Sequence, residues 1–416
     1  MATNPCIAVV SPFLDKRHGT ERYMAEQVER LARLHGYEVH LYCQRVEDIE
    51  GLEEFRRGQG PSDGRGDSPG RIVWHRVSAI PGPHLLKYVW WLLANQYRRR
   101  RDQRRGFRYD LVYSPGINCW DADVIIIHIV FHQLQRLLGE ELRLWGIPLL
   151  SWPRVIHRKL YYRLIMALEK QIYPSPRVTL AAVSQLTARE VQRHFGRPDV
   201  HVISNGVDTG TFNPEIRQRR RAESRRWLGF VDADFVLLLV GNDWKTKGLV
   251  CLLAAVAACP ELPFKVLVVG RDDRGLYRPT LVRLRLSERV QFANPSPDVM
   301  QFYAAADVYV GPSLHDSFAL PPQEAMACGL PVIVSERAGV SELIHDGADG
   351  FILRDPRDSA TLAGLLRRLF TDPDLCSRLG ETAARTARRY SWERNAEQGR
   401  MLLEEALSNK NSTEAR

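Results

Sequence analysis

Residues 306–333 read ADVYVGPSLHDSFALPPQEAMACGLPVI, and this stretch decides the fold class. It begins with the apolar run Val308–Val310, continues through a polar loop, and reaches a second apolar run at Val332–Val334. Between the runs we expect a helix over Pro321–Cys328, because proline suits a first helical turn, where its missing N–H costs nothing. Such strand–loop–helix–strand units build parallel sheets that bind ligands at the carboxyl ends of their strands.

The same alternation extends along the whole chain. We expect strands at 7–10, 39–42, 110–113, 124–128, 180–184 and 200–204, and then at 235–241, 264–270, 290–292, 308–310 and 332–334. Two such series predict an α/β protein with two Rossmann-like, doubly wound domains that face each other across a cleft.

The domain boundaries follow from this order of elements. The first domain is predicted to cover 1–207 and the second 229–388. Pro214 and a dense arginine cluster mark 208–228 as the interdomain connection. Residues 389–416 are expected to form a C-terminal helix that packs back toward the first domain and ends in a disordered tail.

Composition limits the class of protein. Of 416 residues, 44% are hydrophobic and 26% charged, which excludes wholesale disorder. The longest apolar run, Leu249–Cys259, is well short of the ~18 residues that cross a bilayer. Seven cysteines without a C-x-x-C pair indicate neither a disulfide framework nor a zinc ribbon. Residues 1–6 lack a basic segment followed by an apolar one, so we do not expect a cleaved secretory signal. We therefore expect a reduced, cytoplasmic protein whose net charge of +9 indicates an anionic partner.

The loop between Val310 and the predicted helix has the character of an anion site. The backbone N–H groups of Ser317, Phe318, Ala319 and Leu320 lie at the positive end of that helix, which suits a diphosphate. One turn into the helix, Glu324 can accept hydrogen bonds from two vicinal ribose hydroxyls. Asp316, at the start of the loop, can do the same for the hydroxyls of a sugar.

Asp316 and Glu324, with seven residues between them, carry a family resemblance together with Val202–Asp208, Lys247-Gly248, Gly339–Gly350 and Tyr390-Ser391-Trp392. The sequence resembles the GT-B glycosyltransferases of family 4, which are retaining enzymes that use nucleotide sugars. A weaker similarity, in the helical stretch ending at Lys170, is to the lipopolysaccharide-core glucosyltransferases of that family. The resemblance covers nearly the whole chain and implies the GT-B fold.

The resemblance also implies roles for residues outside this block. Lys247 matches the lysine that contacts the donor diphosphate, and Lys245 can supply the charge of an arginine that Asn242 replaces. Gly19 matches a glycine of the phosphate loop, in which His18 stands for the first glycine. His128 matches a histidine near the reacting sugar carbon, with His132 as an alternative. Asp316 stands where the family most often has glutamate, which leaves the donor sugar open.

Catalysis is expected to proceed without a metal or other cofactor. Asp121 and Asp123 form a D-x-D pattern, but it precedes the strand at 124–127 and so lies at the wrong strand end for a GT-A metal site. P-loop and G-x-G-x-x-G patterns are absent. The alternatives are a sugar-nucleotide-binding protein without turnover and a GT-B sugar-nucleotide epimerase.

The partners expected are a UDP- or GDP-sugar and a lipid-linked or envelope-glycan acceptor, as in lipopolysaccharide or polysaccharide biosynthesis. Arg98–Arg101 follow Trp90 and Trp91, and a second group of aromatic and basic residues lies within 145–163. Such surfaces bind anionic membranes, which predicts a peripheral protein on the inner face of the cytoplasmic membrane. No nucleic-acid-binding module is present, so nucleic acid is not an expected partner.

Overall fold

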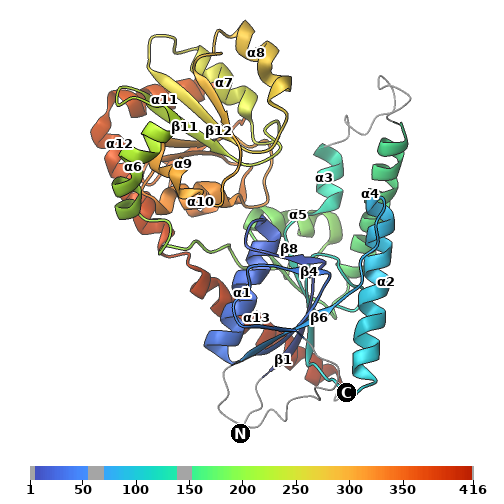
Figure 1. Cartoon of the computed structure of the whole chain (residues 1–416). Coiled ribbons are helices and arrows are strands. Elements are labelled where there is room, and N and C mark those ends of the chain that lie inside the picture. The colour runs from blue at the N-terminus through green and yellow to red at the C-terminus, as the bar shows by residue number, and fades with distance from the viewer. Residues whose placement is uncertain (1–4, 55–69, 138–151, 415–416) are drawn as a thin grey trace. The chain divides into compact units, whose positions relative to one another are not determined.

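The computed structural model describes residues 5–54, 70–137 and 152–414, which divide into two compact units. The first unit comprises Met1–Ser204 and Trp392–Arg416, and the second comprises Asn205–Ser391. Each unit has a parallel sheet with helices packed on it (Figure 1). The predicted α/β class with two Rossmann-like, doubly wound domains is thereby confirmed.

The first unit is built on an eight-stranded parallel sheet within the described residues. In sheet order its strands are β10 (His201–Val202), β9 (Thr179–Ala182), β8 (Val124–Ile127), β7 (Leu111–Pro115), β1 (Cys6–Val10), β3 (Glu38–Cys43), β6 (Arg71–Arg76) and β5 (Leu52–Glu54). A separate short pair joins β2 (Phe13–Leu14) to β4 (Arg45–Val46). The helices are α1 (Gly19–His35), α2 (His84–Gln103), α3 (Phe131–Leu137), α4 (Trp152–Ile172), α5 (Gln185–Phe195) and α13 (Trp392–Glu414). The central strands are apolar runs because helices bury both faces of the sheet.

The second unit has a six-stranded parallel sheet within the described residues. In sheet order its strands are β13 (Val290–Ala293), β12 (Phe264–Val269), β11 (Phe235–Val240), β14 (Val308–Gly311), β15 (Val332–Ser335) and β16 (Phe351–Leu353). The helices are α6 (Pro214–Leu228), α7 (Leu249–Ala257), α8 (Arg278–Arg283), α9 (Met300–Ala305), α10 (Leu320–Ala327), α11 (Ser359–Thr371) and α12 (Pro373–Ala387), with 3-10 turns η2 (Arg274–Tyr277) and η3 (Gly339–Leu343). The strand order changes direction between β11 and β14, the position at which such sheets bind ligands.

The segment 208–228 differs from its sequence prediction as an interdomain connection. Most of it is helix α6, which packs against α9 inside the second unit. Arg221 and Arg225, one helical turn apart, both bind the carboxylate of Asp307, and Arg225 also donates to the carbonyl of Ala305. Arg221 and Arg225 therefore anchor α6 to the loop before β14, whereas Arg219 and Arg226 of the same helix are exposed.

Helix α13 belongs to the first unit although it ends the chain. It packs against α1, where Asn395 accepts a hydrogen bond from Gln27 at 3.2 Å and Glu393 pairs with Arg30 at 2.9 Å. The helix continues to Glu414, and residues 415–416 of the expected tail lie outside the described residues. Although α2, α4 and α13 are long, no helix in the described ranges is both long and apolar enough to cross a membrane.

Candidate functional site

Two loops meet at the carboxyl edge of the second unit's sheet. Residues 241–248 lead from β11 into α7, and residues 312–319 lead from β14 into α10. Because β11 and β14 are neighbours, the loops lie side by side, and the amide of Leu314 donates to the carbonyl of Thr246 at 2.7 Å.

Lys247 and Asp316, both predicted from the sequence, are brought together by these loops. The Lys247 ammonium forms an ion pair with the Asp316 carboxylate, and both side chains are about one-fifth exposed (21% and 18%). Gly248 makes this possible: its φ is +80°, and a Cβ there would lie 1.9 Å from the carbonyl oxygen of Pro312. The close approach of the two loops therefore requires glycine at position 248.

Backbone hydrogen bonds join the loop before α10 to residues 337–340, which lead into η3. The amide of Asp316 donates to the carbonyl of Arg337, and the amide of Val340 donates to the carbonyl of Phe318. Ala319 has φ +73°, a backbone conformation that costs a residue with a Cβ about 1–3 kcal/mol and is concentrated at functional sites.

The four amides predicted to bind an anion stand just before or at the start of α10. Leu320 is its first residue, and Pro321 and Pro322 lack N–H groups. The amide of Phe318 donates to Asp316 Oδ1 at 3.4 Å, so it is engaged inside the loop. The donors nearest the helix terminus in sequence are therefore the amides of Ala319 and Leu320.

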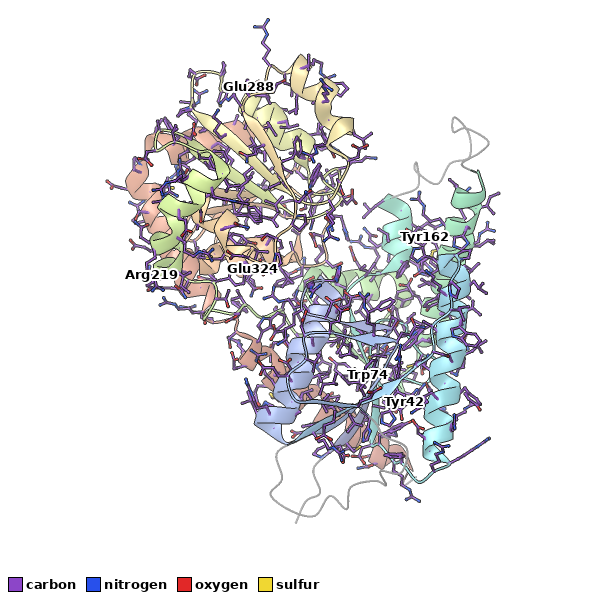
Figure 2. All side chains as sticks on the ribbon, viewed as in Figure 1. Tyr42, Trp74, Tyr162, Arg219, Glu288 and Glu324 are labelled. Carbon is purple, nitrogen blue, oxygen red and sulfur yellow. The ribbon has the colours of Figure 1, made fainter. Side chains whose placement is uncertain are left out.

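Glu324 lies on α10 in the interior of the second unit (Figure 2). Its side chain is buried, and Oε2 accepts a hydrogen bond from the Tyr303 hydroxyl of α9 at 2.6 Å. Burial, together with the negative charge of Glu324, raises the pKa of Tyr303 well above its usual value, so the phenol remains a donor. Nothing in the sequence indicated that Tyr303 would donate a hydrogen bond to Glu324.

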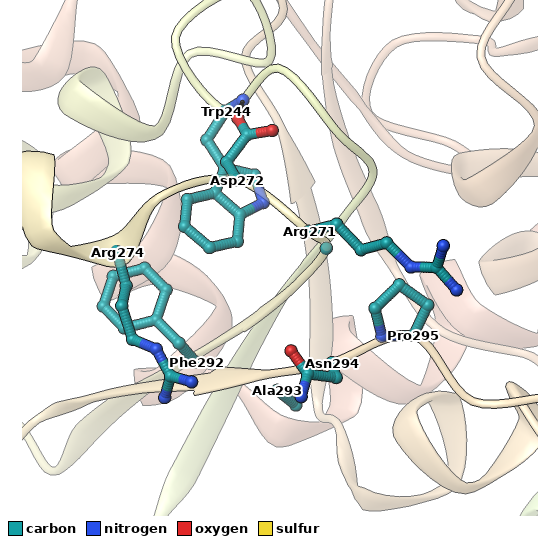
Figure 3. Close-up of a pocket in the computed structure, with 9 residues that line it drawn as sticks. Trp244, Arg271, Asp272, Arg274, Phe292, Ala293, Asn294 and Pro295 are labelled. Atoms are coloured by element: carbon teal, nitrogen blue, oxygen red, sulfur yellow. Dashed lines mark hydrogen bonds between the residues drawn. The ribbon is translucent and has the colours of Figure 1, made fainter.

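A cavity of about 430 Å³ opens at the carboxyl ends of β12 and β13 (Figure 3). Trp244 and Phe292 supply apolar walls, while Arg271, Asp272 and Asn294 supply polar groups. Asp272 accepts the amides of Asp243 and Trp244, which ties the cavity to the loop that carries Lys247. The indole Nε1 of Trp244 is buried and has no hydrogen-bond partner among the described residues.

Sequence reasoning missed this cavity. Its signal was Gly270, directly after β12, where a Cβ would lie 2.5 Å from the indole nitrogen of Trp244. Only a glycine there leaves room for the indole at the end of the strand.

His128 directly follows β8 in the first unit and is nearly fully buried. Neither ring nitrogen has a partner in hydrogen-bonding geometry among the described residues. Burial lowers its pKa to about 4, so the ring is neutral at pH 7. The ring packs edge-to-face on Tyr23 of α1, at 4.9 Å between centroids. An unpartnered buried polar ring is the kind of exception that marks functional sites.

His132, the alternative to His128, has a structural partner. Its Nδ1 lies 2.6 Å from Glu169 Oε2, and the same carboxylate accepts the amides of Phe131 and His132. Glu169 thus caps the start of α3 from α4.

Gly19 is the first residue of α1 and is exposed. The loop before it is organised by Asp15, whose carboxylate accepts the amides of Arg17 and His18 and contacts His18 Nδ1 at 2.9 Å. Burial opposes ionisation of Asp15, but these hydrogen bonds outweigh it and lower the pKa. His18 has φ −112°, which any residue adopts, so this loop does not require a glycine at position 18.

The carboxylates of the D-x-D pattern are both held by side chains of the protein, and both precede β8 as the sequence indicated. Asp121 forms a two-pronged ion pair with Arg99, at 2.6 and 2.9 Å. Asp123 accepts the amide of Val112 and pairs with Lys410 at 3.1 Å.

Comparisons with known proteins identify the family. The family description "Glycosyltransferase Family 4" matches residues 17–211, and "Glycosyl transferases group 1" matches residues 220–386. Among curated relatives, a D-inositol 3-phosphate glycosyltransferase of Arthrobacter sp. (strain FB24) is 29% identical over 357 residues, which cover 79% of each chain. Another so named, from Thermobispora bispora, is 28% identical over 94% of this chain and 90% of its own.

Two solved structures are similar in fold. WaaG, a glycosyltransferase involved in lipopolysaccharide biosynthesis, superposes with a TM-score of 0.72 at 20% identity, covering 94% of this chain and 98% of its own. HepE of Anabaena, in complex with UDP-glucose, gives a TM-score of 0.65 at 19% identity over 98% and 99% of the two chains. The chain belongs to the family 4 glycosyltransferases of GT-B fold and is a transferase. The predicted family and enzyme class are therefore confirmed.

Proposed function

We propose that this glycosyltransferase transfers a sugar, with retention and without a metal, from a UDP- or GDP-sugar to a lipid-linked or envelope-glycan acceptor. The proposal for the donor rests on the Lys247–Asp316 ion pair at the carboxyl edge of the second unit's sheet, beside the start of α10. Asp272 connects the loop that carries Lys247 to the 430 Å³ cavity. A cation, backbone amides and a partly apolar cavity are what a nucleoside diphosphate requires.

Each part of the donor has a matching group in the second unit. The base occupies the cavity beside Trp244, and Glu324 accepts hydrogen bonds from the ribose hydroxyls. Lys247, supported by Lys245 and the amides of Ala319 and Leu320, binds the diphosphate. Asp316 binds hydroxyls of the sugar. HepE, of the same fold, was solved with UDP and with UDP-glucose, which supports this class of donor.

The chemistry requires no nucleophile from the protein. The bond from the anomeric carbon to the diphosphate oxygen breaks, a bond from the acceptor oxygen forms on the same face, and the leaving diphosphate takes the acceptor proton. Lys247 stabilises the charge that develops on the leaving group. His128, neutral at pH 7, contacts the reacting sugar, and Gly19 lets the backbone approach the phosphates.

Turnover in EDTA tests this proposal. Purified protein is incubated with radiolabelled UDP- and GDP-sugars and candidate acceptors, and we expect labelled product with unchanged yield when EDTA is present. Loss of turnover in EDTA, restored by Mn²⁺ or Mg²⁺, contradicts the metal-free mechanism. Tight donor binding without transfer to any acceptor favours the non-catalytic binding protein, and an epimerised nucleotide sugar favours the epimerase.

The acceptor proposal rests on the outer face of α2. Its exposed apolar residues recur at helical spacing and form one stripe, here called the α2 stripe: Leu86, Val89, Trp90, Leu93 and Tyr97. Exposed basic residues lie along and beyond it at Lys87, Arg100 and Arg104, and Ile156 and Leu160 are exposed on the neighbouring α4. An apolar stripe bordered by positive charge fits an anionic membrane surface.

Part of the sequence prediction for this surface is wrong. Trp91 is buried in the core, and Arg99 is buried in its ion pair with Asp121. Arg98 pairs with the buried Asp102 at 3.1 Å. Residues 145–151 of the second predicted group lie outside the described residues. Replacing all of Arg98–Arg101 therefore disturbs the fold, because it removes a buried charge pair.

Liposome co-sedimentation tests the membrane proposal. We expect wild type to sediment with phosphatidylglycerol-containing liposomes at low salt and to be released by high salt. Lys87→Ser, Arg100→Ser and Arg104→Ser combined should weaken binding about 100-fold, since each basic residue near an anionic surface contributes about 1 kcal/mol.

The matched control changes three exposed arginines of the second unit, Arg219 (Figure 2), Arg226 and Arg283, to serine, with the same loss of charge. Equal weakening in both triple variants, or no sedimentation of wild type, contradicts the proposal. The relatives named D-inositol 3-phosphate glycosyltransferase support a second candidate, a soluble phosphorylated polyol, which is included among the acceptors assayed.

A further inference from the structure

Three side chains capable of binding a metal lie together at the amino-terminal edge of the first unit's sheet. Cys6 opens β1 and Glu38 opens β3, and the two residues are register partners in adjacent parallel strands. His40 follows two residues after Glu38, so all three side chains lie on one face of the sheet. One ligand atom of each lies within 4.8 Å of the other two.

The distances suit a shared ion. His40 Nε2 is 3.3 Å from Glu38 Oε1. Two ligands of a tetrahedral zinc ion, each about 2.0–2.1 Å from the metal, are themselves about 3.3–3.4 Å apart. Thiolate, imidazole and carboxylate are the three ligand types that Zn²⁺ binds.

A buried chain of hydrogen bonds from Asp102 through His75 orients His40. Asp102 Oδ2 accepts from Arg98 Nε at 3.1 Å and from the hydroxyl of Tyr42, so it acts as an acceptor toward His75 Nδ1, 2.9 Å away. His75 therefore carries its proton on Nδ1 and accepts at Nε2, which lies 2.8 Å from His40 Nδ1. His40 in turn carries its proton on Nδ1, because a hydrogen bond needs one donor.

This tautomer, assigned from the hydrogen-bond network, leaves the Nε2 lone pair of His40 directed at the Glu38 carboxylate. The Nε2 lone pair and the carboxylate oxygen Oε1, 3.3 Å apart, can therefore both bind one cation placed between them. The carboxylate of Asp110, which accepts the Cys6 amide at 2.8 Å, adds negative charge at the same edge and favours a divalent cation. A carboxylate that orients a metal-ligating histidine through its second nitrogen is a common device at metal sites; here His75 lies between the two.

We propose that Cys6, Glu38 and His40 bind one divalent transition metal ion, with Zn²⁺ as the best fit, and that His75 and Asp102 position His40 for it. The site lies at the opposite edge of the sheet from His128, which follows the carboxyl end of β8. The ion therefore fastens β1 to β3 and stabilises the first unit, and it takes no part in glycosyl transfer.

Cobalt titration of the full chain tests the proposal. Protein stripped with a chelator, then freed of it, is titrated with Co²⁺ and followed by absorption. We expect one equivalent to give visible bands of tetrahedral cobalt and a thiolate-to-cobalt charge-transfer band, both displaced by Zn²⁺. Cys6→Ser should abolish the charge-transfer band. Cys376→Ser, a change at another partly exposed cysteine, should keep it.

His75→Gln tests the positioning role, because it leaves all three ligands in place. Cobalt affinity should fall about 10–100-fold while the charge-transfer band is retained. Zn²⁺ should raise the Tm of wild type and not that of Cys6→Ser, with folding checked by far-UV circular dichroism. No saturable cobalt spectrum in wild type, or identical spectra in wild type and Cys6→Ser, overturns the proposal.

One further assay separates metal binding at Cys6 from a metal requirement of glycosyl transfer. Cys6→Ser lacks this site, so EDTA acts on that variant only if a metal serves elsewhere. Turnover of Cys6→Ser that is unchanged by EDTA leaves the metal-free transfer mechanism standing whatever the cobalt result. Loss of turnover in EDTA by Cys6→Ser contradicts that mechanism and does not bear on the Cys6 site.

Discussion

Replacing Lys247 with alanine is expected to lower kcat about 10²–10³-fold. Its ammonium is the cation paired with Asp316 at the carboxyl edge of the second unit, and we assign it to the departing diphosphate. Removing one preorganised group that stabilises developing negative charge costs about 2.7–4 kcal/mol in the transition state. The measurement is steady-state kinetics with the donor identified in the turnover assay.

Stability should change little in this variant, because both partners of the ion pair are partly exposed and such pairs contribute about 1 kcal/mol or less. Lys265→Ala is the matched control: this lysine, on β12, donates to the carbonyl of Glu288. Lys247→Arg should recover part of the loss by restoring the charge. An unchanged kcat in folded Lys247→Ala removes Lys247 from the donor site.

Glu324→Gln is expected to weaken UDP or GDP binding about 10–100-fold. Hydrogen bonds to an ionised carboxylate are worth about 1.5–3 kcal/mol each, against about 0.5–1.5 for neutral ones, and two ribose hydroxyls are involved. Isothermal titration calorimetry with the free nucleotide measures this loss without a need for the acceptor.

Glutamine is a better substitution than alanine because Glu324 is buried and accepts the Tyr303 hydroxyl. Alanine leaves that buried hydroxyl without its acceptor, which costs about 1–3 kcal/mol of stability in addition to any effect on binding. Tyr303→Phe serves as the control, since it removes the internal hydrogen bond but leaves the Glu324 carboxylate in place, and it should alter Tm but not nucleotide affinity. Equal nucleotide affinities in wild type and folded Glu324→Gln refute the ribose assignment.

Local sequence pattern was sufficient for the fold class, whereas Lys247, Lys245 and Gly19 entered the candidate site through the family resemblance. Apolar runs of strand length that alternate with helical spacing are properties of neighbouring residues, so they can be recognised without the tertiary structure. Lys247, Asp316 and Glu324 each stand at a fixed offset from a predicted strand or helix. Parallel strands align their carboxyl ends, which is why the loops carrying Lys247 and Asp316 emerge at the same edge of the sheet.

Local sequence pattern was insufficient to predict which arginines are buried. Arg99 and Arg100 are adjacent on one helix, yet one is buried against Asp121 and the other is exposed. Arg221 and Arg225 likewise bind Asp307, some 80 residues away, so a segment predicted as a connection is a packed helix. A charged side chain is rarely buried without a partner, and for Arg99, Arg221 and Arg225 that partner lies on another element, which local sequence pattern does not identify.

The sequence by itself determined the two-domain α/β architecture, because strand and helix periodicities are encoded residue by residue. It also determined the sheet edge at which loops 241–248 and 312–319 emerge, since the direction of a parallel strand fixes the edge at which the following loop begins. Tertiary structure alone decided the partner of Glu324, the cavity beside Trp244 and the grouping of Cys6 with Glu38 and His40. Each of these depends on which strands are neighbours and in what register they pair, and that choice is set by long-range packing of the whole sheet.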